Sequence, residues 1–298
     1  MAFLDSRVVF LFVLTASAQS SQSQLLEAAG SNYRALRSAE AVRLYREYLA
    51  HFADRADVRT YLGGALLNLH QLRGALEEAK QAITLDGRYA KAYTLAGRVY
   101  TEQRQWELAG EFFDRAIAID PGDRETWYFL GRSSYDANRF ERAIDAFLHA
   151  LKLGPGQSRV YENLGLAYEA TSQFEHAENA YRRAVELSGT AYRPFVAYGV
   201  FLFKQGRMTE SLCLLERAFL LEPSAVDVRF EFGRVLYQAG KLAEATQVLQ
   251  GALPSNECRV HNLLARVFAI QGKSGEAERE VESLKKCHGE TGSLATQP

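Results

Sequence analysis

The sequence predicts an all-α fold, a right-handed superhelix (solenoid) of about seven to eight helical hairpins. Three observations predict it: small residues that recur every 34 residues, apolar residues at helical spacing inside each repeat, and a composition that favours helix. The 298 residues are 47% hydrophobic and 24% charged, with only six prolines. This is ordinary globular composition, with enough apolar side chains for a large core.

The repeat is defined by three interleaved series of small residues. One series of glycines has a constant interval of 34 residues: Gly63, Gly97, Gly131, Gly165, Gly199 and Gly233. A series of alanines from Ala82 to Ala252 keeps the same interval. A third series, from Ala75 to Ala245, is also alanine except at Ser211. Chance does not give three series one period over six units, so the chain is interpreted as stacked repeats.

Each repeat is predicted to form two antiparallel helices. In the unit that begins at Ala90, one helical face carries Tyr93, Ala96, Gly97 and Tyr100, and the next carries Ala109, Phe113 and Ala116. Gly97 has no side chain, so we expect it to let the two helices approach closely, and a Leu there should force them apart. Prolines at 121, 155 and 223 follow the second helix and are expected to end it.

These residues resemble the tetratricopeptide repeat family. The best match is the unit 124–157, which has the family's pattern in Trp127, Leu130, Gly131, Ala143, Phe147, Ala150 and Pro155. It departs at Ser134, where the family has Tyr. The resemblance covers units that begin at 56, 90, 124, 158, 192, 226 and 258. It implies a solenoid that binds other proteins and that is not an enzyme.

The ends of the chain differ from the repeats. Residues 19–55 occupy one further period without the Leu-Gly pair and are interpreted as a degenerate capping hairpin, the solenoid as 56–287, and 288–298 as a disordered tail.

Residues 1–18 have the pattern of a signal peptide. Arg7 precedes an apolar run from Val8 to Leu14, and Ala16-Ser17-Ala18 gives the small-x-small pattern of a cleavage site. We expect cleavage after Ala18, a secreted or periplasmic protein, and no membrane span in the mature chain. The alternatives are a buried N-terminal helix and an uncleaved anchor.

One face of each first helix is expected to line a concave, peptide-binding groove. The residues predicted to line this groove are aromatic or arginine: Arg98, Tyr128, Arg132, Tyr135, Phe203, Phe230, Arg234, Tyr237 and Arg266. Both types are enriched at binding surfaces. The four arginines share one repeat position, and this arginine ladder is expected to receive carboxylates from an acidic or C-terminal segment. The alternative is that the aromatics brace neighbouring helices and the arginines pair with Glu162, Glu169 or Asp136.

Catalytic and metal chemistry is not indicated. The six histidines are scattered and look like surface residues, and no nucleophile is paired with a base, so we expect no enzyme activity, metal or cofactor. A net charge of -1 gives no broad attraction for phosphate backbones, so nucleic acid is not an expected partner.

The three cysteines cannot all pair within the chain. Cys258 begins and Cys287 ends the last hairpin, and a bridge between them is one alternative. Neighbouring helix axes lie about 8 to 10 Å apart, whereas a bridge needs Cα atoms within about 7 Å, so the spacing leaves the pairing open. Cys213 is expected to be a small buried hydrophobe.

The predicted function is a non-catalytic scaffold or adaptor that binds a peptide or helix of an unidentified protein partner. The alternative is a structural component that self-associates, as a homo-oligomer, into an envelope or secretion complex.

Overall fold

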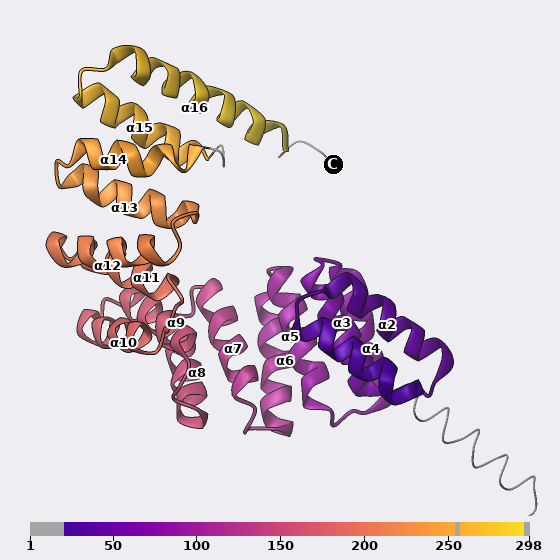
Figure 1. The fold of residues 1–298 in the computed structure, drawn as a ribbon. Coiled ribbons are helices and arrows are strands. Elements are labelled where there is room, and N and C mark those ends of the chain that lie inside the picture. The colour runs from indigo at the N-terminus through magenta and orange to yellow at the C-terminus, as the bar shows by residue number, and fades with distance from the viewer. Residues whose placement is uncertain (1–20, 254–256, 295–298) are drawn as a thin grey trace, which may run out of the picture. The chain divides into compact units, whose positions relative to one another are not determined.

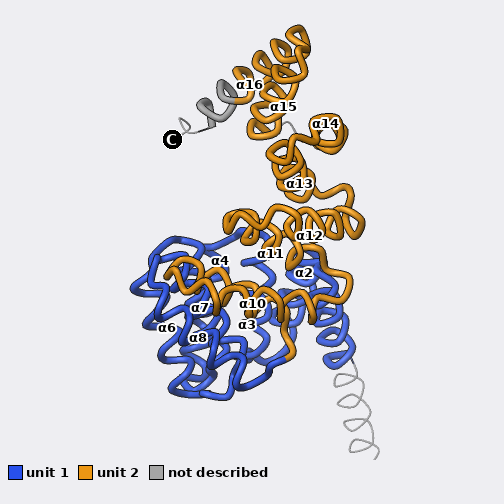
Figure 2. The backbone as a smooth tube through the Cα atoms, turned by 90° about the vertical axis from the view of Figure 1, so that its left-hand side faces the viewer, with its two compact units in different colours: residues 1–155 blue, residues 156–298 orange. Residues whose placement is uncertain are grey.

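The computed structural model describes residues 21–253 and 257–294, with side chains described as far as Cys287. Throughout these residues the regular elements are helices and no strand occurs, so the predicted all-α solenoid of helical hairpins is confirmed (Figure 1). The chain forms two compact units, residues 1–155 and 156–298 (Figure 2). The expected signal peptide, 1–18, lies outside the described residues. No helix in the described ranges combines the length and apolar character needed to cross a membrane.

The described residues of unit 1 form four helical hairpins. The first is formed by a helix over residues 21–34 and α2 (Ser38–His51), and Gln22 Nε2 donates a hydrogen bond of 2.6 Å to the Tyr48 hydroxyl. The other three are α3 (Ala56–Asn68) with α4 (Leu72–Leu85), α5 (Ala90–Glu102) with α6 (Trp106–Ile119), and α7 (Arg124–Asp136) with α8 (Phe140–Leu153). Prolines 121 and 155 stand just beyond the ends of α6 and α8.

Unit 2 also contains four hairpins. They are α9 (Ser158–Ala170) with α10 (Phe174–Glu186), α11 (Arg193–Lys204) with α12 (Met208–Leu221), α13 (Val226–Gln238) with α14 (Leu242–Gln250), and α15 (Cys258–Ile270) with α16 (Ser274–Leu294). The tail predicted to begin at His288 is therefore helical as far as Leu294.

The glycine series marks where the second helix of each hairpin packs on the first. A Cβ added at Gly97 would lie 2.9 Å from Cδ1 of Phe113, and one at Gly131 would lie 2.5 Å from Cε1 of Phe147. In unit 2 the same position faces Tyr181 at Gly165, Leu215 at Gly199 and Leu249 at Gly233. The glycine therefore accommodates a large side chain of the partner helix, and both Phe113 and Phe147 are fully buried there.

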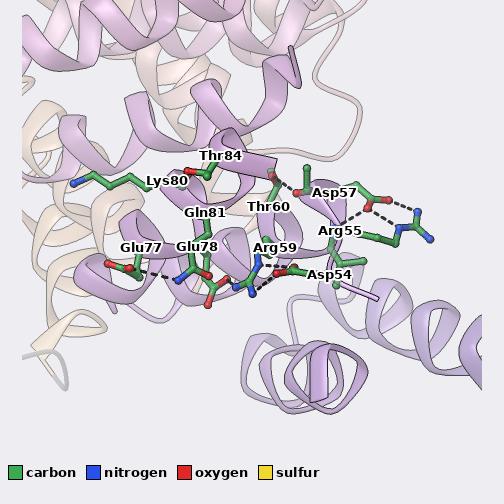
Figure 3. Close-up of polar contacts among 12 residues, drawn as sticks. Asp54, Arg55, Asp57, Arg59, Thr60, Glu77, Glu78, Lys80, Gln81 and Thr84 are labelled. Carbon is green, nitrogen blue, oxygen red and sulfur yellow. Dashed lines mark hydrogen bonds and ion pairs between the residues drawn. The ribbon is translucent and has the colours of Figure 1, made fainter. Parts of the chain in front are cut away.

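An ion-pair network fixes α3 against α4 (Figure 3). The Arg59 guanidinium donates to Asp54 at 2.6 Å and to Glu78 on α4 at 2.7 Å, and the side chains of Arg59 and Glu78 are both 18% exposed. Because Arg59 is largely screened from water, this pair holds the second helix in register more firmly than an exposed pair.

Candidate functional site

A groove in unit 2 brings together five of the predicted groove residues. It is a pocket of about 630 Å³ that we call the unit 2 groove, and its walls come from α11, α13, α15 and α16. Its lining residues are Phe203, Phe230, Arg234, Tyr237, Gln238, Cys258, Arg259, Asn262, Leu263, Arg266 and Leu284. The predicted clustering of aromatics and arginines on first helices is therefore present in this unit.

The arginines of this groove lie on the faces of its aromatic rings. The Arg234 Cζ lies 4.6 Å from the centre of the Phe203 ring, and the Arg266 Cζ lies 5.2 Å from that of Tyr237. Arg259 covers Phe230 in the same way, at 4.6 Å. In each pair the arginine belongs to the helix pair that follows the aromatic, so the cation–π contacts also bind neighbouring hairpins together. The aromatics thus do brace the repeats, as the alternative interpretation held.

The charges in the unit 2 groove are only partly balanced. Arg234 donates through Nε to Glu231 at 2.9 Å, and Arg259 donates to Glu257 at 2.6 Å. Arg266 is exposed, and among the described residues the structure gives it no ion pair. Among the described residues, no carboxylate lines the groove itself, so Arg266 is a positive charge at its wall that none of them balances.

Unit 1 contains a smaller site that holds two of the ladder arginines. A pocket of about 440 Å³ is lined by Arg98 and Arg132 together with Phe129, and the acidic Glu102 also lines it. Arg98 lies over the Phe129 ring at 4.2 Å, whereas Arg132 is exposed. This pocket extends to His70, in the turn after α3, so it is not confined to the faces of the first helices.

Two predicted groove residues of unit 1 lie elsewhere. Tyr128 is only 6% exposed, and its ring lies 6.1 Å from that of Phe147, so it belongs to the core. Tyr135 is half-buried against Phe140, with ring centres 5.4 Å apart, and does not line the unit 1 pocket. The prediction for Tyr128 was therefore wrong by one residue, because the neighbouring Phe129 is the side chain that meets Arg98, whereas Arg132 on the same helix does line the pocket.

Of the three carboxylates expected as alternative partners of the arginine ladder, Glu162 and Glu169 interact with other residues, and Asp136 interacts with Arg132. Glu169 accepts from Lys204 at 2.6 Å and from the Tyr181 hydroxyl at 3.0 Å. Burial raises the pKa of Glu162, and the positive charge of Arg193 partly offsets this effect. For Asp136, burial raises the pKa and Arg132 opposes the rise, so Arg132 and Asp136 do influence each other electrostatically.

Six lining residues of the unit 2 groove were not among the predicted groove residues: Gln238, Cys258, Arg259, Asn262, Leu263 and Leu284. Arg259 lies seven residues before Arg266 and so on the same helical face, a spacing that could have identified it. Leu284 belongs to the second helix of its hairpin, whereas the sequence pattern predicted a groove lined by first helices alone. Cys258 was predicted only as a possible disulfide partner, and it lines the groove as well.

The cysteines divide into one bridge and one thiol. Cys258 and Cys287 form a disulfide with Cα atoms 5.6 Å apart. This distance is shorter than the usual distance between helix axes, because Cα atoms on the facing sides of two packed helices lie closer together than the axes do. Cys213, on α12, is exposed, so the expectation that it is buried was wrong.

One histidine also departs from the expected surface position. His261 is 6% exposed and its Nδ1 lies 2.6 Å from Glu280 Oε2, which links α15 to α16. No group of three or more His, Cys, Asp or Glu side chains that could hold a metal ion occurs in the part of the chain that the structure describes.

Comparison with protein families identifies the repeat. One tetratricopeptide repeat model matches residues 62–124, 128–192 and 162–218, and a second matches 202–267. The chain belongs to the tetratricopeptide repeat family. Such repeats typically form non-catalytic interaction scaffolds. No curated protein matches the sequence significantly.

Solved structures of tetratricopeptide repeat proteins share the fold. A chain of the APC/C hetero-tetramer Cut9–Hcn1 matches with a TM-score of 0.65 and 17% identity, over 88% of this chain and 52% of that one. Yeast Tom70 matches with a TM-score of 0.62 and 17% identity, over 87% of this chain and 59% of that one. This tetratricopeptide repeat chain thus spans little more than half the length of either, and the likeness concerns the fold alone.

Proposed function

We propose that this tetratricopeptide repeat protein is a non-catalytic adaptor that holds an extended, acidic segment of a partner protein in the unit 2 groove. The observation that carries the proposal is Arg266, an exposed arginine that lies over the Tyr237 ring. Among the described residues it has no ion pair, and no carboxylate lines the groove beside it.

The stacked arginines suit carboxylate recognition. A guanidinium that rests on an aromatic ring uses its face for the ring and keeps its N–H edges for an acceptor. The ring also restricts the arginine side chain before a ligand arrives, which reduces the entropy lost on binding. A carboxylate can take two N–H bonds from such an edge, and the apolar parts of Phe203 and Leu263 provide contact for the intervening chain.

The test is fluorescence anisotropy with a short labelled peptide of Glu and Gly that has a free C-terminal carboxylate, called the acidic probe. Its neutral counterpart has Gln for Glu and an amidated end. We expect the acidic probe to bind at least about tenfold more tightly than the neutral one, and Arg266→Ala to weaken it about tenfold. Arg217→Ala, at an exposed position on α12 away from the groove, is the matched control. Equal affinity of Arg266→Ala and the parent would refute the proposal.

We also propose that the protein is secreted or periplasmic. The signal-peptide pattern of residues 1–18 supports this, and so does the Cys258–Cys287 disulfide, because such bonds persist in oxidising compartments. N-terminal sequencing of the protein from its host should find Gln19 first. An intact Met1 would contradict the proposal.

Self-association is the second candidate function. Two large apolar side chains of unit 2, Leu220 on α12 and Ile270 at the end of α15, are 67% and 60% exposed, which favours contact with another protein surface. Light scattering after size-exclusion chromatography separates the two candidates. A mass that stays that of a monomer across concentrations favours the adaptor, and a concentration-dependent oligomer favours the structural role.

A further inference from the structure

We infer that α16 is a wall of the unit 2 groove and that the Cys258–Cys287 disulfide is the latch that holds it there, so that ligand affinity depends on the redox state of this bond. The inference rests on the proposed function for its ligand. The position of the bond relative to the groove rests on the structure alone.

The disulfide lies directly at the groove. Cys258 lines the groove from the start of α15, and Leu284 lines it from α16. Leu284 stands three residues before Cys287, which is one helical turn, so both side chains lie on the same face of α16. Fixing Cys287 to α15 therefore fixes Leu284 against the groove.

Apart from the bond, the described side chains of α16 make few buried contacts. Other second helices bury from three side chains, as in α4 and α12, to six, as in α8. Among the described side chains of α16, residues 274–287, only Cys287 is buried, at 5% exposure. Ala277 and Leu284 are half-buried, and Glu280 contacts His261 at 2.6 Å. A helix that buries so little apolar surface opens more readily than its neighbours.

Reduction would release this latch. A dithiol reductant attacks one sulfur of the bridge, the S–S bond breaks, and a second exchange leaves Cys258 and Cys287 as thiols while the reductant becomes a cyclic disulfide. The two electrons and two protons come from the reductant. The turn is then the only covalent link between α15 and α16, and the Glu280–His261 contact and the half-buried Ala277 and Leu284 are what still hold the helix. We expect the wall that bears Leu284 to be ordered for part of the time.

The experiment compares oxidised and reduced protein in a Cys213→Ser background. This substitution removes the exposed thiol, so that dithiothreitol acts on the Cys258–Cys287 disulfide. Two quantities are measured: the Kd for the acidic probe, and amide hydrogen exchange along the chain. We expect dithiothreitol to speed exchange in α16 and to weaken the probe about tenfold, as it would if the wall were in place for about a tenth of the time. Exchange in α9 to α12 should be unchanged. A variant with both Cys258→Ser and Cys287→Ser should behave like the reduced protein, with no response to dithiothreitol.

Three results would overturn the inference: equal Kd values in the oxidised and reduced states, unchanged exchange in α16, and loss of protection throughout unit 2. The last would mean that the bond maintains the whole unit and not one wall. If the oxidised protein does not bind the probe at all, the proposed function fails, whereas the exchange of α16 still decides whether the bond acts as a latch.

Discussion

At the scale of single residues, the glycine series determines how closely each hairpin packs. The sequence predicted a close approach at Gly97, and the structure shows that the space is occupied by a ring from the partner helix. Gly131 is the clearest case, because the Phe147 ring beside it is fully buried and has no room to move.

Replacing Gly131 by Leu should therefore destabilise the protein. We expect the free energy of unfolding to fall by about 3 kcal/mol, because the new side chain overpacks a filled core. Gly74→Ala in α4 is the matched control, since the added Cβ would lie an ordinary 3.4 Å from Leu66, and helix propensity favours Ala by about 1 kcal/mol. Urea unfolding followed by circular dichroism measures both. A Gly131→Leu variant as stable as Gly74→Ala would refute this account of the packing.

Glu178 should make stability depend on pH. The hydrogen bond from Arg207, 2.7 Å long, lowers the pKa of Glu178 below its ordinary 4.5, and burial opposes this lowering. A lowered pKa contributes stability that is present above pH 4.5 and is lost as the pH falls through the lowered value.

Glu178→Gln should therefore cost about 1 kcal/mol of unfolding free energy at pH 7, because it weakens a hydrogen bond to a charged group. The difference from the parent should shrink below pH 4.5, where the parent carboxylate itself becomes protonated. The measurement is urea unfolding at a series of pH values, with Glu175→Gln at an exposed position of the same helix as control. A difference that does not change with pH would show that the charge is not responsible.

At the scale of elements, the turn inside each hairpin contains a residue with positive φ. These residues form a fourth periodic series, which cannot be recognised from the residue types. The backbone has positive φ at Leu36, His70, Arg104, Asn138, Ser172, Gly206 and Gly240, again at intervals of 34 residues. The residue after each of these positions donates its backbone N–H to the carbonyl of the residue five positions before it. Gln105, for example, donates to the Tyr100 carbonyl at 2.9 Å. This hydrogen bond is the Schellman motif that ends a helix. Because five different non-glycine residues hold this position, no composition pattern predicts it.

The turn position allows a pair of opposite substitutions. Arg104→Gly should raise the free energy of unfolding by about 1 kcal/mol, because glycine adopts φ of +57° without strain. Gly206→Ala, at φ of +77°, should lower it by about 1 kcal/mol. Thermal unfolding measures both, and changes of the same sign would show that backbone strain does not control this turn.

The sequence predicted the hairpins well because their signal is local and repeated. Helix spacing, small residues and prolines recur in every unit, so a single departure does not hide the pattern. The candidate site was harder to predict. Side chains one position apart on a helix can be core or surface, as Tyr128 and Phe129 show, and the outcome depends on the neighbouring hairpin.

At the scale of the whole molecule, the two units differ in how they present the arginine ladder. In unit 1 the pocket that holds Arg98 and Arg132 is shared with Glu102, whereas the unit 2 groove, as far as the structure describes its lining, has three arginines and no carboxylate. The arginines that the proposed adaptor would use to bind an acidic segment are therefore mainly those of the unit 2 groove. The repeat period alone could not reveal this difference, because Arg98, Arg132, Arg234 and Arg266 occupy equivalent positions in sequence.

The most direct test of this central claim is amide hydrogen exchange of the oxidised protein with and without saturating acidic probe. We expect slower exchange in α11, α13, α15 and α16, whose side chains line the unit 2 groove, and no change in unit 1. Protection that falls on unit 1, or on the second helices α12 and α14 alone, would contradict it.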